Sequence, residues 1–154
     1  MALLPFELPN IQLPSVLGGT PATEAIPQGS PVPTPVVGPA QRRIRVFPRS
    51  SVRWQARWFP SDDGLERIGV IDSGVNIIID NVQDLDTVDI STDRLVIWTP
   101  SNSLPDLRGA GTQTDDVPLE FYLEGNIVFR QGDRVIYADR MYYNVQEERG
   151  VVLN

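Results

Sequence analysis

The sequence predicts an all-β domain of antiparallel strands, preceded by a proline-rich tail. First, apolar and polar residues alternate from Arg42 onward, with the two-residue period that a strand imposes. Second, the stretches PSDDG (60–64) and QGD (131–133) have the composition of tight turns. Third, no stretch shows the 3.6-residue apolar spacing of an amphipathic helix.

The alternating pattern defines the expected strands. They are 43–47, 52–59, 67–71, 75–80, 88–90, 94–98, 119–130, 134–138, 140–145 and 151–153. Short strands with turns about every dozen residues are typical of all-β domains. The segment 99–118 is too long and polar for a routine hairpin loop, so we expect an insertion there, with a functional lid as the alternative.

Residues 1–41 are expected to form a disordered tail, with the β-domain spanning 42–154. Prolines are mixed with Gly, Ser and Thr in GGTPATEAIPQGSPVPTPVVGPA, a composition that favours extended chain. The tail is interpreted as a linker, with a tether or a proline-motif ligand as the alternative. Because the chain ends at GVVLN, inside a predicted strand, we expect the domain to continue beyond Asn154.

The composition excludes many common enzyme chemistries. The chain has no His and no Cys, which removes thiolate and imidazole metal sites, Ser-His and Cys catalysis and histidine pH switching. No metal and no cofactor are therefore expected. The net charge is −7, with the acidic residues concentrated after residue 57, so a broad nucleic-acid surface is not expected.

A sequence unit recurs with an offset of 46 residues (139 − 93), if Asp93 is aligned with Asp139. SGVNIII precedes TDRLVIW as EGNIVFR precedes ADRMYY, and a weaker third copy begins at QARWF (55–59). Periods of this size indicate stacked or wound β units that share one core.

The pairs Asp93-Arg94 and Asp139-Arg140 are interpreted as structural corners. Ala138 is small where the sheet would bend, and the aspartate can accept backbone N–H bonds that a bent strand leaves unpaired. The arginine would point outward and pair with that carboxylate, contributing about 0 to 1 kcal/mol. The alternative is a catalytic carboxylate pair formed by Asp93 and Asp139.

The stretch IGVIDSGVN (68–76) resembles the aspartate segments of two protease families. The subtilisin interpretation fails because that family needs a histidine and this chain has none. Asp72-Ser73-Gly74 also resembles the motif of aspartic proteases, which need two carboxylates sharing a proton, so a dimer would be required. The repeat favours a simpler interpretation, in which Ser73-Gly74 corresponds to Glu124-Gly125 and begins a strand.

Alternation also predicts which side chains point inward. The predicted inner face consists of Val75, Ile77, Ile79, Val88, Ile90, Leu95, Ile97, Leu119, Phe121, Leu123, Ile127, Phe129, Val135, Tyr137, Met141 and Tyr143. By itself this pattern favours a closed core, with about 1.5 to 3 kcal/mol for each large buried side chain.

The recurring unit resembles the OstA/LptA-like domains of the lipopolysaccharide transport family. The resemblance rests on EGNIV (124–128), QGDR (131–134) and ADRMYY (138–143); it is looser over 74–98 and absent from 1–41. It implies an antiparallel β-jellyroll, open along one edge like a taco, that shields acyl chains and stacks edge to edge with related domains.

The resemblance also implies a function. We expect a non-enzymatic module that binds a lipopolysaccharide-like lipid or bridges its transport, in the periplasm or cell envelope of a diderm bacterium, with a possible outer-membrane partner. The inner-face residues would then line the lipid groove. The alternatives are a structural β-domain that pairs through its edge strands and the dimeric aspartic protease.

Overall fold

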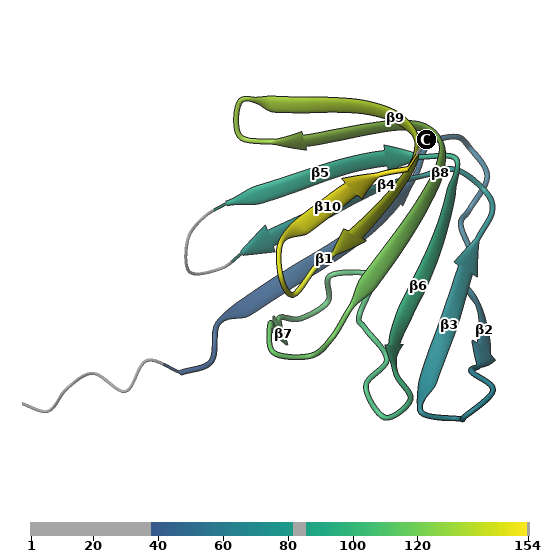
Figure 1. The fold of residues 1–154 in the computed structure, drawn as a ribbon, viewed down its shortest axis with the longest axis vertical. Helices are drawn as coiled ribbons and strands as arrows, with labels where there is room; N and C mark the ends of the chain where they lie inside the picture. Colours follow the sequence, from purple (N-terminus) through teal and green to yellow (C-terminus); the bar gives the residue numbers. More distant parts are fainter. Residues whose placement is uncertain (1–37, 82–85, 154) are drawn as a thin grey trace, which may run out of the picture. The chain divides into compact units, whose positions relative to one another are not determined.

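The computed structural model describes residues 38–81 and 86–153, which form one antiparallel sheet of ten strands and contain no helix. The all-β prediction is confirmed (Figure 1). The strands are β1 (Gln41–Pro48), β2 (Arg57–Pro60), β3 (Glu66–Ile71), β4 (Val75–Asn81), β5 (Thr87–Thr92), β6 (Arg94–Pro100), β7 (Gln113–Thr114), β8 (Glu120–Gln131), β9 (Arg134–Asn144) and β10 (Arg149–Val152). Residues 1–37 of the predicted tail lie outside the described residues, and in the part that is described no helix is long and apolar enough to cross a membrane.

The sheet is folded across its strands along one line. β3 continues into β4, and β5 into β6, through short connections, while β8 and β9 run through the bend without a break. Backbone hydrogen bonds cross the bend in sequence: Arg49 N donates to Gly74 O (3.1 Å), Gly74 N to Asp93 O (2.9 Å) and Asp93 N to Gly125 O (2.9 Å). We call this line the corner.

The corner divides the sheet into two half-sheets that curl around a common interior (Figure 1). The first half-sheet contains β7, β1, β4 and β5, together with 127–131 of β8 and 134–138 of β9. The second contains β2, β3 and β6, with 120–124 of β8, 140–144 of β9 and β10. This curled half-barrel is compatible with the predicted jellyroll.

The predicted strands 134–138 and 140–145 are one strand, β9, and its register shifts where it passes the corner. Glu124 pairs with Arg140, but the next pair is Ile127 with Ala138, so Gly125 and Asn126 together oppose Asp139. Both bulge residues have positive φ, 82° and 45°. A bulge of this kind reverses which side chains of the partner strand face the core.

Val135 and Tyr137 therefore point outward, so their predicted place on the inner face was wrong. They are 48% and 75% exposed. Ile136 and Ala138 pack against the core instead, opposite Phe129 and Ile127. Strict alternation along β9 failed because both Asp139 and Arg140 are exposed at the bend, which changes the phase between Ala138 and Met141.

The segment 99–118 packs along β1. Its short strand β7 pairs with the start of β1, Val46 N donates to the carbonyl of Leu107 (2.8 Å), and Asp115 N donates to that of Ala40 (3.0 Å). Leu107 is only 5% exposed and joins the core. The segment therefore covers the edge of the first half-sheet that β1 would otherwise leave open.

Candidate functional site

The predicted groove residues, apart from Val135 and Tyr137, come together in one buried cluster between the two half-sheets. Each is at most 5% exposed, so the interior is filled by side chains. The cluster contains Val75, Ile77, Ile79, Val88, Ile90, Leu95, Ile97, Leu119, Phe121, Leu123, Ile127, Phe129, Met141 and Tyr143. It also contains residues that the predicted face omitted, namely Ile44, Val46, Ile71, Leu107 and Val145.

One charged side chain lies within this apolar interior. Arg42 alternates with Ile44 and Val46 on the inner face of β1 and is 2% exposed. Its Nη2 donates to the carbonyl of Val117 (2.7 Å) and its Nη1 to that of Asp115 (3.3 Å), while Nε has no hydrogen-bond partner among the described residues. Burial lowers the pKa of Arg42, although the nearby Asp115 and Asp116 carboxylates act in the opposite direction.

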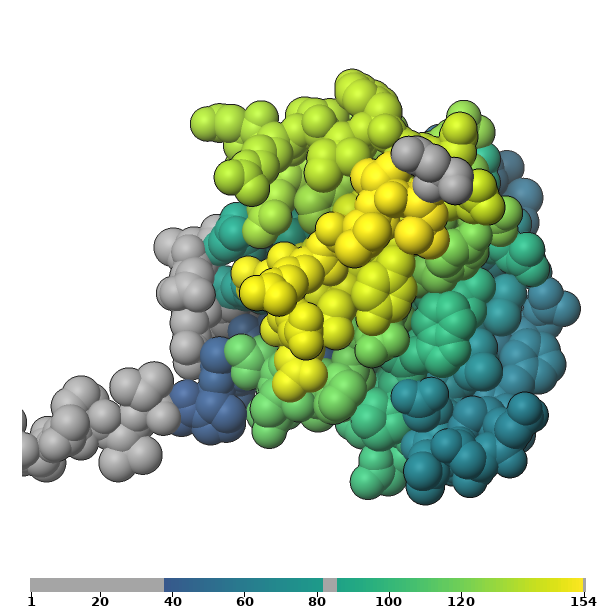
Figure 2. Space-filling view, viewed as in Figure 1, coloured from purple at the N-terminus to yellow at the C-terminus, as the bar shows by residue number. Residues whose placement is uncertain are grey.

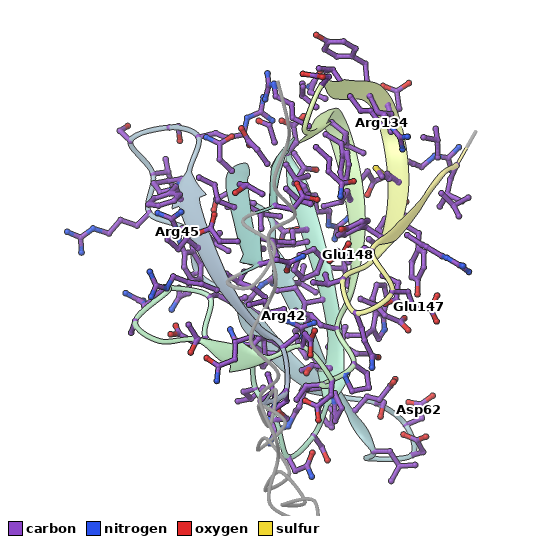
Figure 3. The ribbon with its side chains drawn as sticks, turned by 90° about the vertical axis from the view of Figure 1, so that its left-hand side faces the viewer. Arg42, Arg45, Asp62, Arg134, Glu147 and Glu148 are labelled. Atoms are coloured by element: carbon purple, nitrogen blue, oxygen red, sulfur yellow. The ribbon has the colours of Figure 1, made fainter. Side chains whose placement is uncertain are left out.

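Arg42 marks the end of the interior that lies far from the corner, which we call the mouth. Tyr143 lies near it, and burial, followed by the Glu148 and Asp86 carboxylates, raises the pKa of that phenol well above its usual range. Figure 3 shows Arg42 on β1 and Glu148 on the turn after β9; the Glu148 carboxylate accepts a hydrogen bond from the Asn81 amide. The mouth thus combines one buried cation with several polar groups.

Segment 99–118 closes the mouth through a few polar contacts. Besides the bonds from Arg42, the Thr112 hydroxyl donates to the Gln41 side chain (2.7 Å), and the Gln146 side chain donates to the carbonyl of Asp116 (3.1 Å). The ladder between β7 and β1 comprises only two residue pairs, Gln41 with Thr114 and Arg42 with Gln113. Separating the whole segment from β1 would break this ladder, the bridge between Arg45 and Arg108 and the backbone bonds to Leu107 and Ala40, and would expose Leu107.

Asp93 lies at the corner, as predicted, but its partners differ from those expected. Its two carboxylate oxygens accept bonds from the Arg49 guanidinium (2.7 Å) and the Asn126 amide (2.6 Å), both side-chain donors. A Cβ at Gly125 would lie 2.7 Å from Asp93 Oδ2, so the carboxylate occupies the space that a side chain would need. Asp93 thereby holds the end of β1 against the bulge of β8.

The expected ion pairs within each Asp-Arg dipeptide do not form among the described residues. Arg94 pairs with Asp72 (2.9 Å) and Glu124 (3.6 Å), and no ion pair or carboxylate hydrogen bond joins Asp139 to Arg140. The reason is geometric: Arg94 lies beside Glu124 in the ladder, and Asp139 opposes the bulge.

Asp72 also lies at the corner, where Arg57 and Arg94 both pair with its carboxylate. Gly74 and Gly125 each have positive φ and each bond to the backbone of Asp93, which is the correspondence that the repeat predicted. The strand-entry interpretation of Asp72-Ser73-Gly74 agrees with this geometry.

The outer face of the second half-sheet is a feature that alternation did not predict. Apolar side chains there occupy neighbouring positions across all its strands, and we call them the outer apolar face: Phe59, Ile68, Val70, Val96, Trp98, Tyr122, Tyr142 and Val151. Figure 2 looks onto this half-sheet, with β10 in yellow and β6, β3 and β2 following in teal to blue. A hollow of about 590 Å³ lies between Trp98, Tyr122, Tyr142 and Val151, with Glu66 and Glu120 on its rim.

A sequence signal for this face exists. Strands β3 and β6 contain unbroken apolar runs, IGVI and LVIW, although the run VIYA (135–138) belongs to the first half-sheet, so such runs alone do not single out this face.

Among the described residues, the end strands β2 and β7 each pair with one neighbour, and two further stretches also have free edges. Residues 134–138 of β9 pair with β8 alone, because β10 reaches only 141–144, and β10 pairs with β9 alone. These edges present backbone N–H and C=O groups to an added strand.

The chain was also compared with known proteins. No protein-family model, curated protein or solved structure matches it. Within residues 38–81 and 86–153, no group of three acidic side chains is placed to hold a metal ion.

Proposed function

We propose that this domain is a non-enzymatic module that holds the chains of an anionic amphiphile between its two half-sheets. The observation that carries the proposal is the combination of an apolar interior with one buried arginine at its mouth. Acyl chains gain about 0.8 kcal/mol per buried CH₂. A phosphate or carboxylate headgroup would replace the two backbone carbonyls that accept hydrogen bonds from Arg42 in this conformation.

The resemblance to the lipopolysaccharide transport family makes lipopolysaccharide the first amphiphile to test. We further propose that the domain acts in the envelope of a diderm bacterium, with an outer-membrane protein as a partner to test. An acidic exterior, with a net charge of −7, would disfavour non-specific adhesion to anionic membranes.

Access to the interior requires a movement, because side chains fill it in the present conformation. Segment 99–118 is the part proposed to move, since it covers the mouth and its ladder with β1 comprises only two residue pairs; the movement also withdraws Leu107 from the core. Its displacement would expose the mouth and leave Arg42 without its two carbonyl partners. An arriving headgroup restores those hydrogen bonds, which couples opening to binding.

Photo-crosslinking tests the proposal. A photoreactive residue at Ile127, on the inner face of β8, is expected to capture lipopolysaccharide or a simpler two-chain phospholipid. The matched control is Arg130, three residues along the same strand but on its outer face, which is expected to capture none. Equal capture from both positions, or none from either in a folded protein, would reject the proposal.

The headgroup is tested separately. Arg42→Gln is expected to reduce capture of an anionic two-chain lipid more than capture of a neutral one with the same chains. Equal effects on both lipids would show that Arg42 does not recognise the headgroup.

A second candidate function is strand pairing with another β-domain, favoured by the free edge at 134–138 of β9. Main-chain bonds to that edge would extend the first half-sheet into a neighbouring sheet. Tyr137→Pro removes one N–H that faces the free edge and is expected to abolish such pairing, whereas Tyr137→Ala removes only a side chain. Loss of partner binding in both variants alike would argue against edge pairing.

A further inference from the structure

The outer apolar face requires an explanation that neither the interior nor the strand edges provide. Its side chains are half-buried or exposed, and Phe59 and Val151 are 47% and 55% exposed. Trp and Tyr are enriched in protein interfaces, where they often contribute most of the binding energy. The face is one side of a sheet, and sheets can bury an apolar side by packing on a second sheet about 10 Å away.

We infer that the outer apolar face docks on the same face of a second copy of this chain, about a twofold axis that runs parallel to the strands between β6 and β8. In such an isologous interface each contact occurs twice. The axis places β8 of one copy over β6 of the other, and β9 over β3. Positions in the same row of the ladder then meet across the interface.

From β3 to β10 the central row of the face is apolar. Cross-strand pairing aligns Val70 with Val96, Val96 with Tyr122, and Tyr122 with Tyr142. The twofold axis brings Val96 opposite Tyr122 of the partner copy and Val70 opposite Tyr142. Large aromatic rings therefore meet small branched side chains, the alternation that lets two layers interdigitate.

The next row toward the corner is charged, and the same axis pairs opposite charges. Its members are Asp72, Arg94, Glu124 and Arg140, which lie side by side across β3, β6, β8 and β9. Arg94 comes opposite Glu124 of the partner copy, and Asp72 comes opposite Arg140. This charge complementarity is the feature that favours a second copy as the occupant.

The axis places β2 of one copy over β10 of the other, so Phe59, which pairs with Ile68, comes opposite Arg149 of the partner copy. Arg57, which pairs with Val70, comes opposite Val151. Charges of both signs border the face, since Arg94 and Arg140 lie in the same row as Asp72 and Glu124.

Sedimentation velocity over a range of concentrations tests the inference on the chain of residues 1–154. The wild type is expected to dimerise, and Tyr122→Glu, in the central row, is expected to be monomeric. The matched control is Val128→Glu, on the outer face of the first half-sheet in the same strand, which is expected to dimerise as the wild type does.

A second pair of variants tests the charged row without touching the apolar one. Arg140→Glu places a negative charge opposite Asp72 and is expected to weaken the dimer about tenfold or more. Arg134→Glu makes the same charge change in the same strand, outside the face, and is expected to have no effect.

Circular dichroism confirms folding in each variant, and Arg140→Glu keeps the inference testable if Tyr122→Glu does not fold. A wild type that stays monomeric at all concentrations overturns the inference. So does a dimer that Tyr122→Glu and Val128→Glu weaken equally, or one that Arg140→Glu leaves unchanged. A monomer that floats with anionic phosphatidylglycerol vesicles and loses this binding on Tyr122→Glu would assign the face to a membrane instead.

Discussion

The outer face of the first half-sheet mixes ion pairs with separate apolar side chains, whereas the outer face of the second carries an unbroken apolar row from Val70 to Val151, although β8 and β9 pass through both. On the first, Arg45 pairs with Asp80 (2.6 Å) and Arg130 with Asp89 (3.7 Å). On the second, the outer apolar face occupies the equivalent positions. The first half-sheet therefore has one face suited to contact with water, while the second has two faces suited to burial.

The inner faces of the two half-sheets are expected to be energetically equivalent. Ile90→Ala in the first and Ile97→Ala in the second both remove fully buried side chains. Each is expected to lower the free energy of unfolding by about 2 to 5 kcal/mol, measured by urea denaturation. A loss of stability in only one of these two variants would mean that the half-sheets do not share a core.

The corner that joins the half-sheets is expected to tolerate no side chain in its bulge. Gly125→Ala combines a φ of +82° with a close approach to Asp93, so a loss of about 2 to 3 kcal/mol is expected. The control is Gly132→Ala, where φ is also positive but a Cβ meets nothing within 4 Å; the expected loss is about 1 kcal/mol. Equal losses in thermal unfolding would mean that the contact with Asp93 is unimportant.

The phase change in β9 is expected to appear in neighbouring residues. Ile136 packs against the core, so Ile136→Ala is expected to cost about 1 to 2 kcal/mol of stability. Tyr137 is 75% exposed, so Tyr137→Ala is expected to stay within about 0.5 kcal/mol of the wild type. A larger loss of stability in Tyr137→Ala than in Ile136→Ala would instead support simple alternation along β9.

Alkaline pH is expected to have the smallest effect, and to act at the mouth. The pKa of Tyr143 is raised in the folded state, so folding favours the neutral phenol. Its contribution to stability is complete below about pH 10, where the unfolded chain also keeps the proton, and is lost as the pH rises further. Tyr143→Phe is expected to lessen the fall in melting temperature above pH 10; an unchanged fall would assign it to other groups.

Local pattern predicted the fold class and most of the interior because strand period and turn chemistry act over a few residues. Ile77, Phe121 and Leu123 could be placed correctly from alternation alone. Val135 and Tyr137 could not, because their orientation depends on a bulge in the neighbouring strand.

The partners of Asp93 and the position of segment 99–118 could not be predicted from the sequence, for a related reason. Arg49 lies 44 residues before Asp93, and Asn126 lies 33 residues after it, so no local pattern connects them. Leu107 enters the core from a polar segment, and its burial depends on the edge of β1. The outer apolar face left a partial signal in the sequence, since the unbroken apolar runs in β3 and β6 are consistent with burial on both sides of those strands.

The central claim is that an amphiphile enters between the half-sheets when segment 99–118 leaves β1. Gln41 and Thr114 are paired residues of the β1–β7 ladder, and antiparallel pairs lie within the Cα separation that a disulfide spans. The chain has no cysteine of its own, so Gln41→Cys with Thr114→Cys allows a single reversible disulfide that holds the segment on β1. With the photoreactive residue at position 127, the oxidised protein is expected to capture no lipid and the reduced protein to regain capture, while Gln41→Cys alone captures in both states. Equal capture by the oxidised and reduced forms would contradict the claim.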